Sequence, residues 1–400
     1  MLAKDIRKHS STAIAANALT LPGQWLGSLR LNWAYNAMGG RDLRLDILRG
    51  FAIFVMVIDH WGGASLLYGF TGGNKFLVSA AEGFVLLSGL VAGMVYGKIA
   101  SRENLRAAQI KLLRRAFTLY KLTVALTLIV TAFAVITHSP WADDLPLENP
   151  AEFIFNVITL HQVIAFTDIP MLYTFLLLAA TLALWFMHTR RALWLLIGSG
   201  ALWWFAFSTK MYLPWQVNGG YAFNPGAWQF LFILAMVIGY HWDALKSKLN
   251  WVPRVSAWIL ATLLVALLIQ FYNSDITFFI QLFSSIDLPN LLYEAFRKIA
   301  LGPGRLLVTL LFFAFGYLTL TLLWRPLSAL LGWLLTPLGQ NSLYGYTLHV
   351  ALVGIFTVVA PRLPVQVTEI EIINTGLQLA AILAIWILIQ RRVLFNIIPR

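Results

Sequence analysis

Long apolar stretches recur along the chain after residue 40, and short polar segments separate them. Ten stretches are long enough, or nearly so, to cross about 30 Å of hydrocarbon as helices rising roughly 1.5 Å per residue. This pattern predicts an all-α, polytopic integral membrane protein with about ten transmembrane helices. The expected spans lie near 45–68, 76–97, 115–137, 169–188, 191–208, 227–243, 254–273, 304–324, 341–360 and 371–391.

The composition favours a membrane protein, since 59% of the residues are hydrophobic and only 12% are charged. The chain has no cysteine, which excludes a disulfide framework, a thiol nucleophile and a thiolate metal site. No histidine pair has the spacing of metal ligands, so we expect neither a metal nor a bound cofactor. The net charge of +12 comes from basic residues in short segments beside apolar runs, which is typical of topology signals. Nucleic acid is therefore not an expected partner.

The distribution of basic residues predicts an orientation. With the N-terminus in the cytoplasm, 23 of the 29 lysines and arginines fall on the cytoplasmic side, as the positive-inside rule requires. Both termini are then cytoplasmic. We expect residues 1–40 to form a cytoplasmic tail or an interfacial helix, and residues 41–400 to form one multi-helix membrane domain. The basic stretch 98–121 is predicted to be a cytoplasmic loop that either anchors the topology or binds an anionic substrate.

The first apolar stretch carries three ionisable residues, Arg49, Asp59 and His60. Such groups cost about 2.5–3.5 kcal/mol each at the centre of an inserted helix, so they mark a candidate functional site. In a helix, Arg49 and His60 share one face about 16 Å apart. Asp46 stands where it could pair with Arg49, and both are candidate substrate-binding residues. The alternatives are that Arg49 is a helix-end residue that reaches the interface, and that His60 is only a hydrogen-bonded core residue.

Glu82 begins the second apolar run, close in sequence to the end of the first. At the depth of His60, its carboxylate would orient the imidazole, as in the pairing of a base with an orienting group. We therefore take His60, Asp59 and Glu82 as catalytic candidates. The alternative for Glu82 is a carboxylate that the dipole of its own helix favours.

Further polar residues lie at the ends of later helices and are candidate substrate contacts. Some have structural alternatives: Asp168 and Asn224 as helix caps, and Trp228 as an aromatic-belt residue. The polar stripe in the ninth span either contacts substrate or forms interhelical hydrogen bonds. The candidates are Asp168, Tyr173, Asn224, Trp228, Gln229 and Arg305 at the outer boundary, and Ser342, Tyr346 and His349 in the ninth span.

Several of these residues stand in motifs that occur in one order along the chain. With them, the chain from about Arg41 to the C-terminus resembles the OpgC family, membrane proteins that succinylate osmoregulated periplasmic glucans and are related to the acyltransferase-3 group. That group is marked by an Arg, ten residues and a His, which correspond here to Arg49 and His60. The motifs are Arg41–Gly50, Ile58–His60, Ala81–Glu82 with Leu87–Gly89, Asp168–Tyr173, Phe223–Pro225 with Trp228–Gln229, and Leu338–Gly339 with Asn341–Leu343 and His349.

The resemblance implies an acyltransferase that transfers groups other than aminoacyl groups, in the bacterial inner membrane. His60 is then the base or the acyl-handling residue, and Arg49 contacts an acyl-CoA donor, with succinyl-CoA the donor that the family suggests. The acceptor is a glucan or another envelope carbohydrate. The competing hypothesis is a proton-coupled transporter or flippase that uses Asp59, His60 and Glu82 as a relay.

Overall fold

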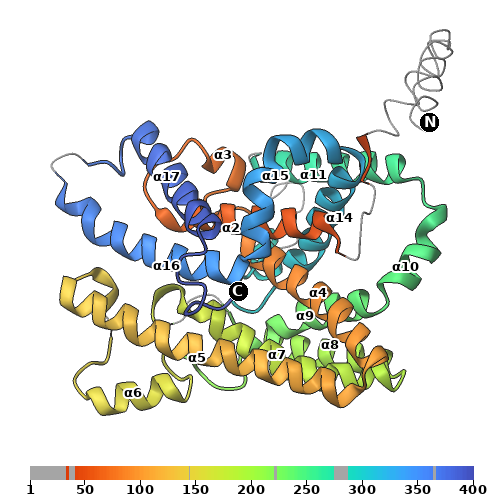
Figure 1. The fold of residues 1–400 in the computed structure, drawn as a ribbon, viewed down its shortest axis with the longest axis horizontal. Coiled ribbons are helices and arrows are strands. Elements are labelled where there is room, and N and C mark those ends of the chain that lie inside the picture. The colour runs from red at the N-terminus through yellow and green to blue at the C-terminus, as the bar shows by residue number, and fades with distance from the viewer. Residues whose placement is uncertain (1–32, 36–40, 144, 220–222, 274–286, 364–365) are drawn as a thin grey trace, which may run out of the picture.

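The computed structural model describes residues 33–35, 41–143, 145–219, 223–273, 287–363 and 366–400. Nearly all of the predicted 1–40 tail lies outside these residues. The described chain is largely helical (Figure 1). Its helices are α2 (Leu43–Trp61), α3 (Tyr68–Thr71), α4 (Ala80–Arg102), α5 (Leu105–Thr137), α6 (Pro150–Ile158), α7 (Asp168–His188), α8 (Ala192–Thr209), α9 (Pro225–Tyr240), α10 (Trp242–Lys248), α11 (Arg254–Asn273), α13 (Leu288–Ala295), α14 (Pro303–Leu322), α15 (Trp324–Gln340), α16 (Ser342–Val359) and α17 (Glu371–Gln390).

Each of the ten predicted apolar stretches contains a helix, which confirms the all-helical class. Eight helices in the described chain are long and apolar enough to cross a membrane: α4, α5, α7, α8, α11, α14, α16 and α17. The pair α9 and α10 qualifies as a ninth only if it is one span bent by 70°. Helix α2 is not among them, because it carries two arginines and two aspartates in 19 residues.

Two predicted boundaries differ from the structure, and one helix was not predicted. The stretch 98–121 is not a loop, because α4 continues to Arg102 and α5 begins at Leu105. The first span, expected to reach residue 68, ends at Trp61, where Gly62 adopts a φ of 82°. Helix α15 was not predicted, because polar residues and prolines near both of its ends leave only a short uninterrupted apolar run.

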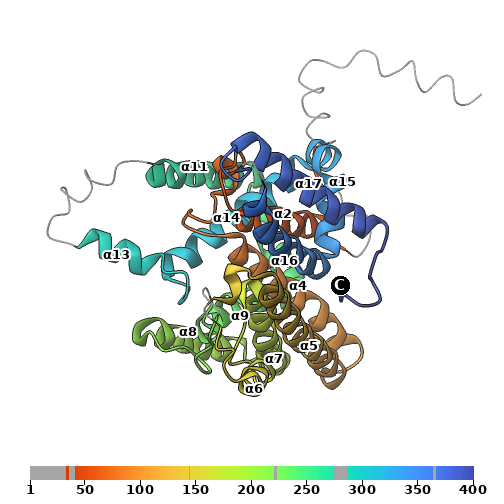
Figure 2. The same cartoon turned by 90° about the vertical axis from the view of Figure 1, so that its left-hand side faces the viewer.

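Helices α4 and α9 approach each other closely enough for backbone contact. A Cβ added at Gly93 of α4 would lie 2.0 Å from the carbonyl oxygen of Met236, and one at Gly239 of α9 would lie 1.9 Å from that of Leu90. Small residues at such crossings let two backbones meet, which is a common basis of helix packing in membranes. This contact joins α4 to the group of α5, α7, α8 and α9, which lies below in Figures 1 and 2.

Helix α2 lies inside the bundle, where it packs against α4, α14, α15, α16 and α17. Its crossing with α15 again depends on glycine: a Cβ at Gly50 would lie 1.9 Å from the Leu335 carbonyl oxygen, and one at Gly339 would lie 1.8 Å from that of Asp46. Figure 2 shows α15 and α17 above α2, and α5 and α7 below. The ionisable residues of α2 are therefore surrounded by protein, which explains how an otherwise apolar chain tolerates them.

Candidate active site

His60 lies in the last turn of α2 and pairs with His349 of α16. Its Nδ1 is 2.9 Å from Nε2 of His349, and Nδ1 of His349 is 3.0 Å from the carbonyl oxygen of Tyr346. A carbonyl oxygen only accepts, so this network assigns the N–H of neutral His349 to Nδ1 and its lone pair to Nε2. His60 Nδ1–H then donates to His349. Nε2 of His60 keeps its lone pair and is the atom able to take a proton.

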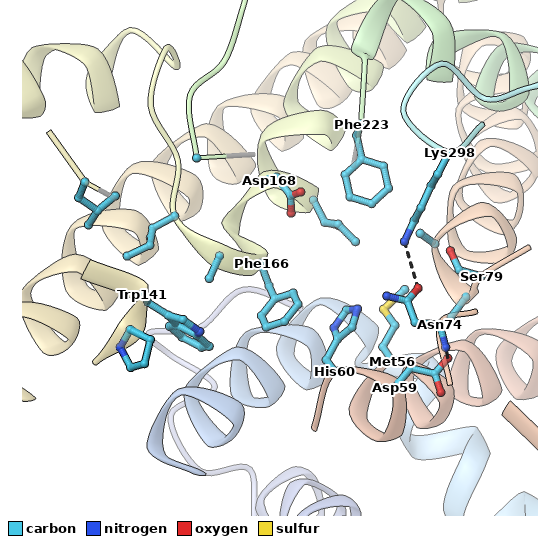
Figure 3. Close-up of a pocket in the computed structure, with 18 residues that line it drawn as sticks. Met56, Asp59, His60, Asn74, Ser79, Trp141, Phe166, Asp168, Phe223 and Lys298 are labelled. Atoms are coloured by element: carbon cyan, nitrogen blue, oxygen red, sulfur yellow. Dashed lines mark hydrogen bonds between the residues drawn. The ribbon is translucent and has the colours of Figure 1, made fainter. Parts of the chain in front are cut away.

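His60 borders a cavity of about 390 Å³, here called the His60 cavity (Figure 3). The ring of Phe166 stacks on the imidazole with centroids 4.2 Å apart and an interplanar angle of 15°. The volume falls in the usual range of small-molecule sites, about 300–1,000 Å³. The lining combines aromatic rings with a few charged groups: Met56, Asp59, His60, Asn74, Ser79, Ala80, Ala81, Pro140, Trp141, Leu145, Ile164, Ala165, Phe166, Asp168, Ile169, Gly219, Phe223 and Lys298.

Asp59 lines this cavity but does not orient His60. Its Oδ1 accepts a hydrogen bond from the Thr71 hydroxyl at 2.5 Å, and its Oδ2 accepts one from the backbone N–H of Asn74 at 3.1 Å. The carboxylate therefore fixes the segment that follows α3. His349, rather than Asp59, holds the imidazole.

Glu82 is fully buried at the start of α4, and it does not reach His60 either. It accepts hydrogen bonds from the backbone N–H and the hydroxyl of Ser79, at 2.9 and 2.6 Å, in a capping box. It also forms an ion pair with Arg305, whose side chain is almost as buried. The prediction that Glu82 orients the imidazole is wrong, because a buried carboxylate takes the nearest cation and the N-terminal donors of its own helix. The pair ties α14 to α4.

Lys298 is a residue of the site that the sequence did not reveal. Figure 3 shows its side chain reaching into the His60 cavity, where Nζ donates to the side-chain oxygen of Asn74 at 3.1 Å. Burial lowers the pKa of the Lys298 ammonium, and the nearby Glu82 carboxylate opposes that shift. In the sequence it is one of a few basic residues in a long segment between two predicted spans, and nothing local connects it to His60.

A second cavity, of about 220 Å³, lies near the opposite end of α2 and is here called the Arg49 cavity. Arg49 donates to the Ser88 hydroxyl at 3.3 Å, as does Tyr173, also at 3.3 Å. The Nε of Arg49 is buried and has no partner among the described residues. The lining residues are Arg49, Phe84, Ser88, Val91, Ala92, Val95, Tyr96, Arg115, Leu119, Ile169, Pro170, Tyr173, Leu177, Phe232, Ser342, Leu343 and Tyr346.

Asp46 is not the partner of Arg49. It forms an ion pair with Arg41 at 2.7 Å, five residues earlier in the chain. Within the described chain, no carboxylate lies within ion-pair distance of Arg49 or of Arg115, the second cation of the cavity. Because an unpaired guanidinium away from water is costly, the cavity is suited to an anionic ligand.

The two cavities meet at the beginning of α7. Ile169 lines both of them. Tyr346, from the Arg49 cavity, donates its hydroxyl to the carbonyl oxygen of Phe166, which lines the His60 cavity. The side chains of Ile169 and Tyr346 thus form a layer between a cationic chamber and the chamber that His60 borders.

Three predicted acceptor contacts have structural roles instead and line neither cavity. Asn224 caps α9, since its Oδ1 accepts from the backbone N–H of Gly226 at 3.1 Å. Trp228 is fully buried and donates its ring N–H to the carbonyl oxygen of Lys298 at 3.1 Å, so it is neither a belt residue nor an open face for a sugar. Gln229 accepts a hydrogen bond from Ser199 at 2.6 Å. A sequence does not distinguish polar residues that form hydrogen bonds with the backbone and with one another from polar residues that bind ligands.

Of the other predicted contacts, Arg305 pairs with Glu82 and His349 pairs with His60, and neither lines either cavity, whereas the remaining four do. Asp168, 6% exposed at the start of α7, lines the His60 cavity. Tyr173, Ser342 and Tyr346 line the Arg49 cavity. Across the residues that the structure describes, no group of three or more possible metal ligands occurs.

The family model of the OpgC protein matches residues 41–392. The chain therefore belongs to the OpgC family, which confirms the resemblance in its motifs. Neither a curated protein nor a solved structure gives a significant match. Membership implies a membrane protein with an acyltransferase-like role in glucan modification, and hence a carbohydrate acceptor.

Proposed function

We propose that this protein is an O-acyltransferase of the bacterial inner membrane, which transfers an acyl group from acyl-CoA to a hydroxyl of a periplasmic glucan or another envelope carbohydrate. Succinyl is the acyl group that the family suggests. The observation that carries the proposal is the His60–His349 pair, because it leaves Nε2 of His60 unprotonated at a cavity of suitable size for a sugar unit.

In the proposed reaction, Nε2 of His60 takes the proton of the acceptor hydroxyl. The hydroxyl oxygen attacks the thioester carbonyl carbon, a new C–O bond forms, and the C–S bond breaks. The sulfur leaves with the bonding electron pair as CoA thiolate and receives the proton from His60, so the products are an ester and free CoA. His349 accepts a hydrogen bond from His60 throughout and stabilises the imidazolium that forms.

The donor is proposed to bind in the Arg49 cavity. Arg49 and Arg115 would hold phosphate oxygens of CoA, because guanidinium groups bind phosphate through charged hydrogen bonds. His60 stands eleven positions after Arg49 in α2, about 16 Å at the usual rise. The acyl chain would cross the layer at Ile169 to reach the imidazole. In the orientation that places both termini in the cytoplasm, the Arg49 cavity faces the cytoplasm and the His60 cavity faces the periplasm.

The transporter hypothesis requires a proton relay through Asp59, His60 and Glu82. The contacts within the described chain give no support for that relay, because Glu82 pairs with Arg305 and Asp59 bonds to the segment after α3. Membranes incubated with radiolabelled acyl-CoA and glucan separate the two functions. Label in glucan supports transfer, and accumulation of substrate without labelled glucan supports transport.

The variant His60→Ala tests the proposed base. We expect its rate of glucan acylation to fall about 10²–10⁴-fold, the usual contribution of a positioned general base. The matched control is His188→Ala, at the exposed end of α7, which should keep the wild-type rate. Unchanged acylation by the His60→Ala protein, present at wild-type amounts in the membrane, refutes the mechanism.

A further inference from the structure

We propose that Lys298 determines which acyl group is transferred, by binding a carboxylate at the far end of the acyl chain. This inference rests on the proposed acyl transfer and concerns the same cavity. It starts from the position of the ammonium group: Figure 3 shows Lys298 extending into the space that His60 borders. A group esterified near His60 would have its distal end within the same cavity.

The ammonium of Lys298 has unused hydrogen-bonding capacity. A lysine ammonium carries three N–H donors, and only one of them has a described partner, the neutral side-chain oxygen of Asn74 at 3.1 Å. Among the residues that the structure describes, no carboxylate oxygen lies within ion-pair distance of Nζ. Two donors and one full charge therefore remain for a ligand.

The backbone around Lys298 is held in place before any ligand binds. The ring N–H of the buried Trp228 donates to the carbonyl oxygens of Lys298 and Ile299, at 3.1 and 3.2 Å. The backbone N–H of Asn224 also donates to the Ile299 carbonyl, at 3.0 Å. Such a fixed cation loses little freedom on binding an anion, which increases its selectivity.

Two carboxylates in the same cavity restrict where an anion can bind. Asp59 accepts hydrogen bonds from Thr71 and from the backbone of Asn74, while Asp168 faces the cavity from the start of α7. Both repel an anion that is placed elsewhere in the cavity. A carboxylate is thus bound favourably only next to Lys298.

An uncharged acyl chain lacks the carboxylate that Lys298 would bind. Acetyl or propionyl would leave the ammonium of Lys298 without an anionic partner, and a site built around a polar group rejects analogues that lack it. A hydrogen-bonded charge pair gives a preference of about 10-fold to 100-fold. We therefore expect the wild-type protein to use succinyl-CoA in preference to acetyl-CoA by at least about tenfold.

The test measures glucan acylation by succinyl-CoA and by acetyl-CoA in membranes with wild-type protein, Lys298→Met, Lys298→Arg and Lys75→Met. Lys298→Met removes the charge at similar chain length, Lys298→Arg keeps it, and Lys75 is an exposed lysine of the segment after α3 that lines neither cavity. We expect Lys298→Met to lower the succinyl rate about tenfold or more, and to lower the succinyl-to-acetyl ratio with it. Lys298→Arg should restore most of the succinyl preference, and Lys75→Met should behave as wild type.

Two results would overturn the inference alone. One is an equal loss of both activities in Lys298→Met, and the other is a succinyl-to-acetyl ratio that stays at the wild-type value. A wild-type protein that transfers neither group to glucan refutes the proposed function, and this inference with it. The two failures are distinguishable because only the second abolishes transfer before any substitution is made.

Discussion

Replacing His349 with Ala removes the acceptor for His60 Nδ1–H and leaves the proton-accepting Nε2 untouched. A hydrogen bond between two neutral groups contributes about 1 kcal/mol, and one with a charged partner about 1.5–3 kcal/mol. His60 becomes charged only as it takes the proton, so the difference of about 0.5–2 kcal/mol lowers the barrier. Without His349, the neutral imidazole of His60 is no longer held with its proton on Nδ1 and populates both tautomers. We expect kcat for glucan acylation to fall about tenfold, with KM for acyl-CoA unchanged.

The assay is the initial rate of acyl transfer at several acyl-CoA concentrations, in membranes with matched amounts of protein. His349→Gln returns a neutral acceptor and should recover part of the loss. The control is Tyr344→Phe, which deletes another buried hydrogen bond of α16, that of the Tyr344 hydroxyl to the Val393 carbonyl at 2.7 Å. Adding His349→Ala to His60→Ala should slow transfer no further, because the two residues act as one unit. A His349→Ala kcat within about twofold of wild type refutes this role for His349.

Three further predictions concern other parts of the site. Arg49→Gln should raise KM for acyl-CoA about tenfold in the same rate assay, because it removes a charged contact to phosphate, and an unchanged KM would exclude Arg49 from donor binding. Glu82→Gln should destabilise the protein by about 3–5 kcal/mol, measured by thermal unfolding in detergent, since it leaves the Arg305 guanidinium buried and unpaired. Adding Arg305→Met should recover part of that loss, and a Glu82→Gln protein of wild-type stability contradicts the buried pair. Ile169→Trp should fill the junction of the two cavities and reduce the rate of acyl transfer. Acyl-CoA should still bind to this variant and protect the protein from proteolysis. Full activity would mean that the acyl chain takes another route.

Structural features that are determined by residues close together in the sequence could be predicted from it. The apolar runs gave the helices, because burial in lipid and the helical rise fix both composition and length. Arg49 and His60 lie in one helix, as their spacing suggested; that they line different cavities emerged only from the structure. Helix α15 was missed because it packs on α2 through Gly339 and not through a continuous apolar run.

Pairings between distant segments could not be predicted from the sequence. His60 and His349 are 289 positions apart, and Glu82 and Arg305 are 223 apart. A single sequence shows which charges must find partners, but it does not show which carboxylate meets which cation. Asp46, expected to pair with Arg49, and Glu82, expected to pair with His60, therefore both have other partners.

The pairing of charges separates residues that support the fold from those available to ligands. Arg44 with Asp42, Arg41 with Asp46, and Arg305 with Glu82 are ion pairs, and none of these six side chains lines either cavity. Arg49, Arg115 and Lys298 have no carboxylate partner in the described chain, and each lines a cavity. A cation away from water needs an anion, so a ligand that satisfies all three must carry negative charge at both ends. An acyl-CoA with a carboxylate on its acyl group has this charge distribution, with phosphates toward Arg49 and Arg115, the thioester toward His60 and the carboxylate toward Lys298.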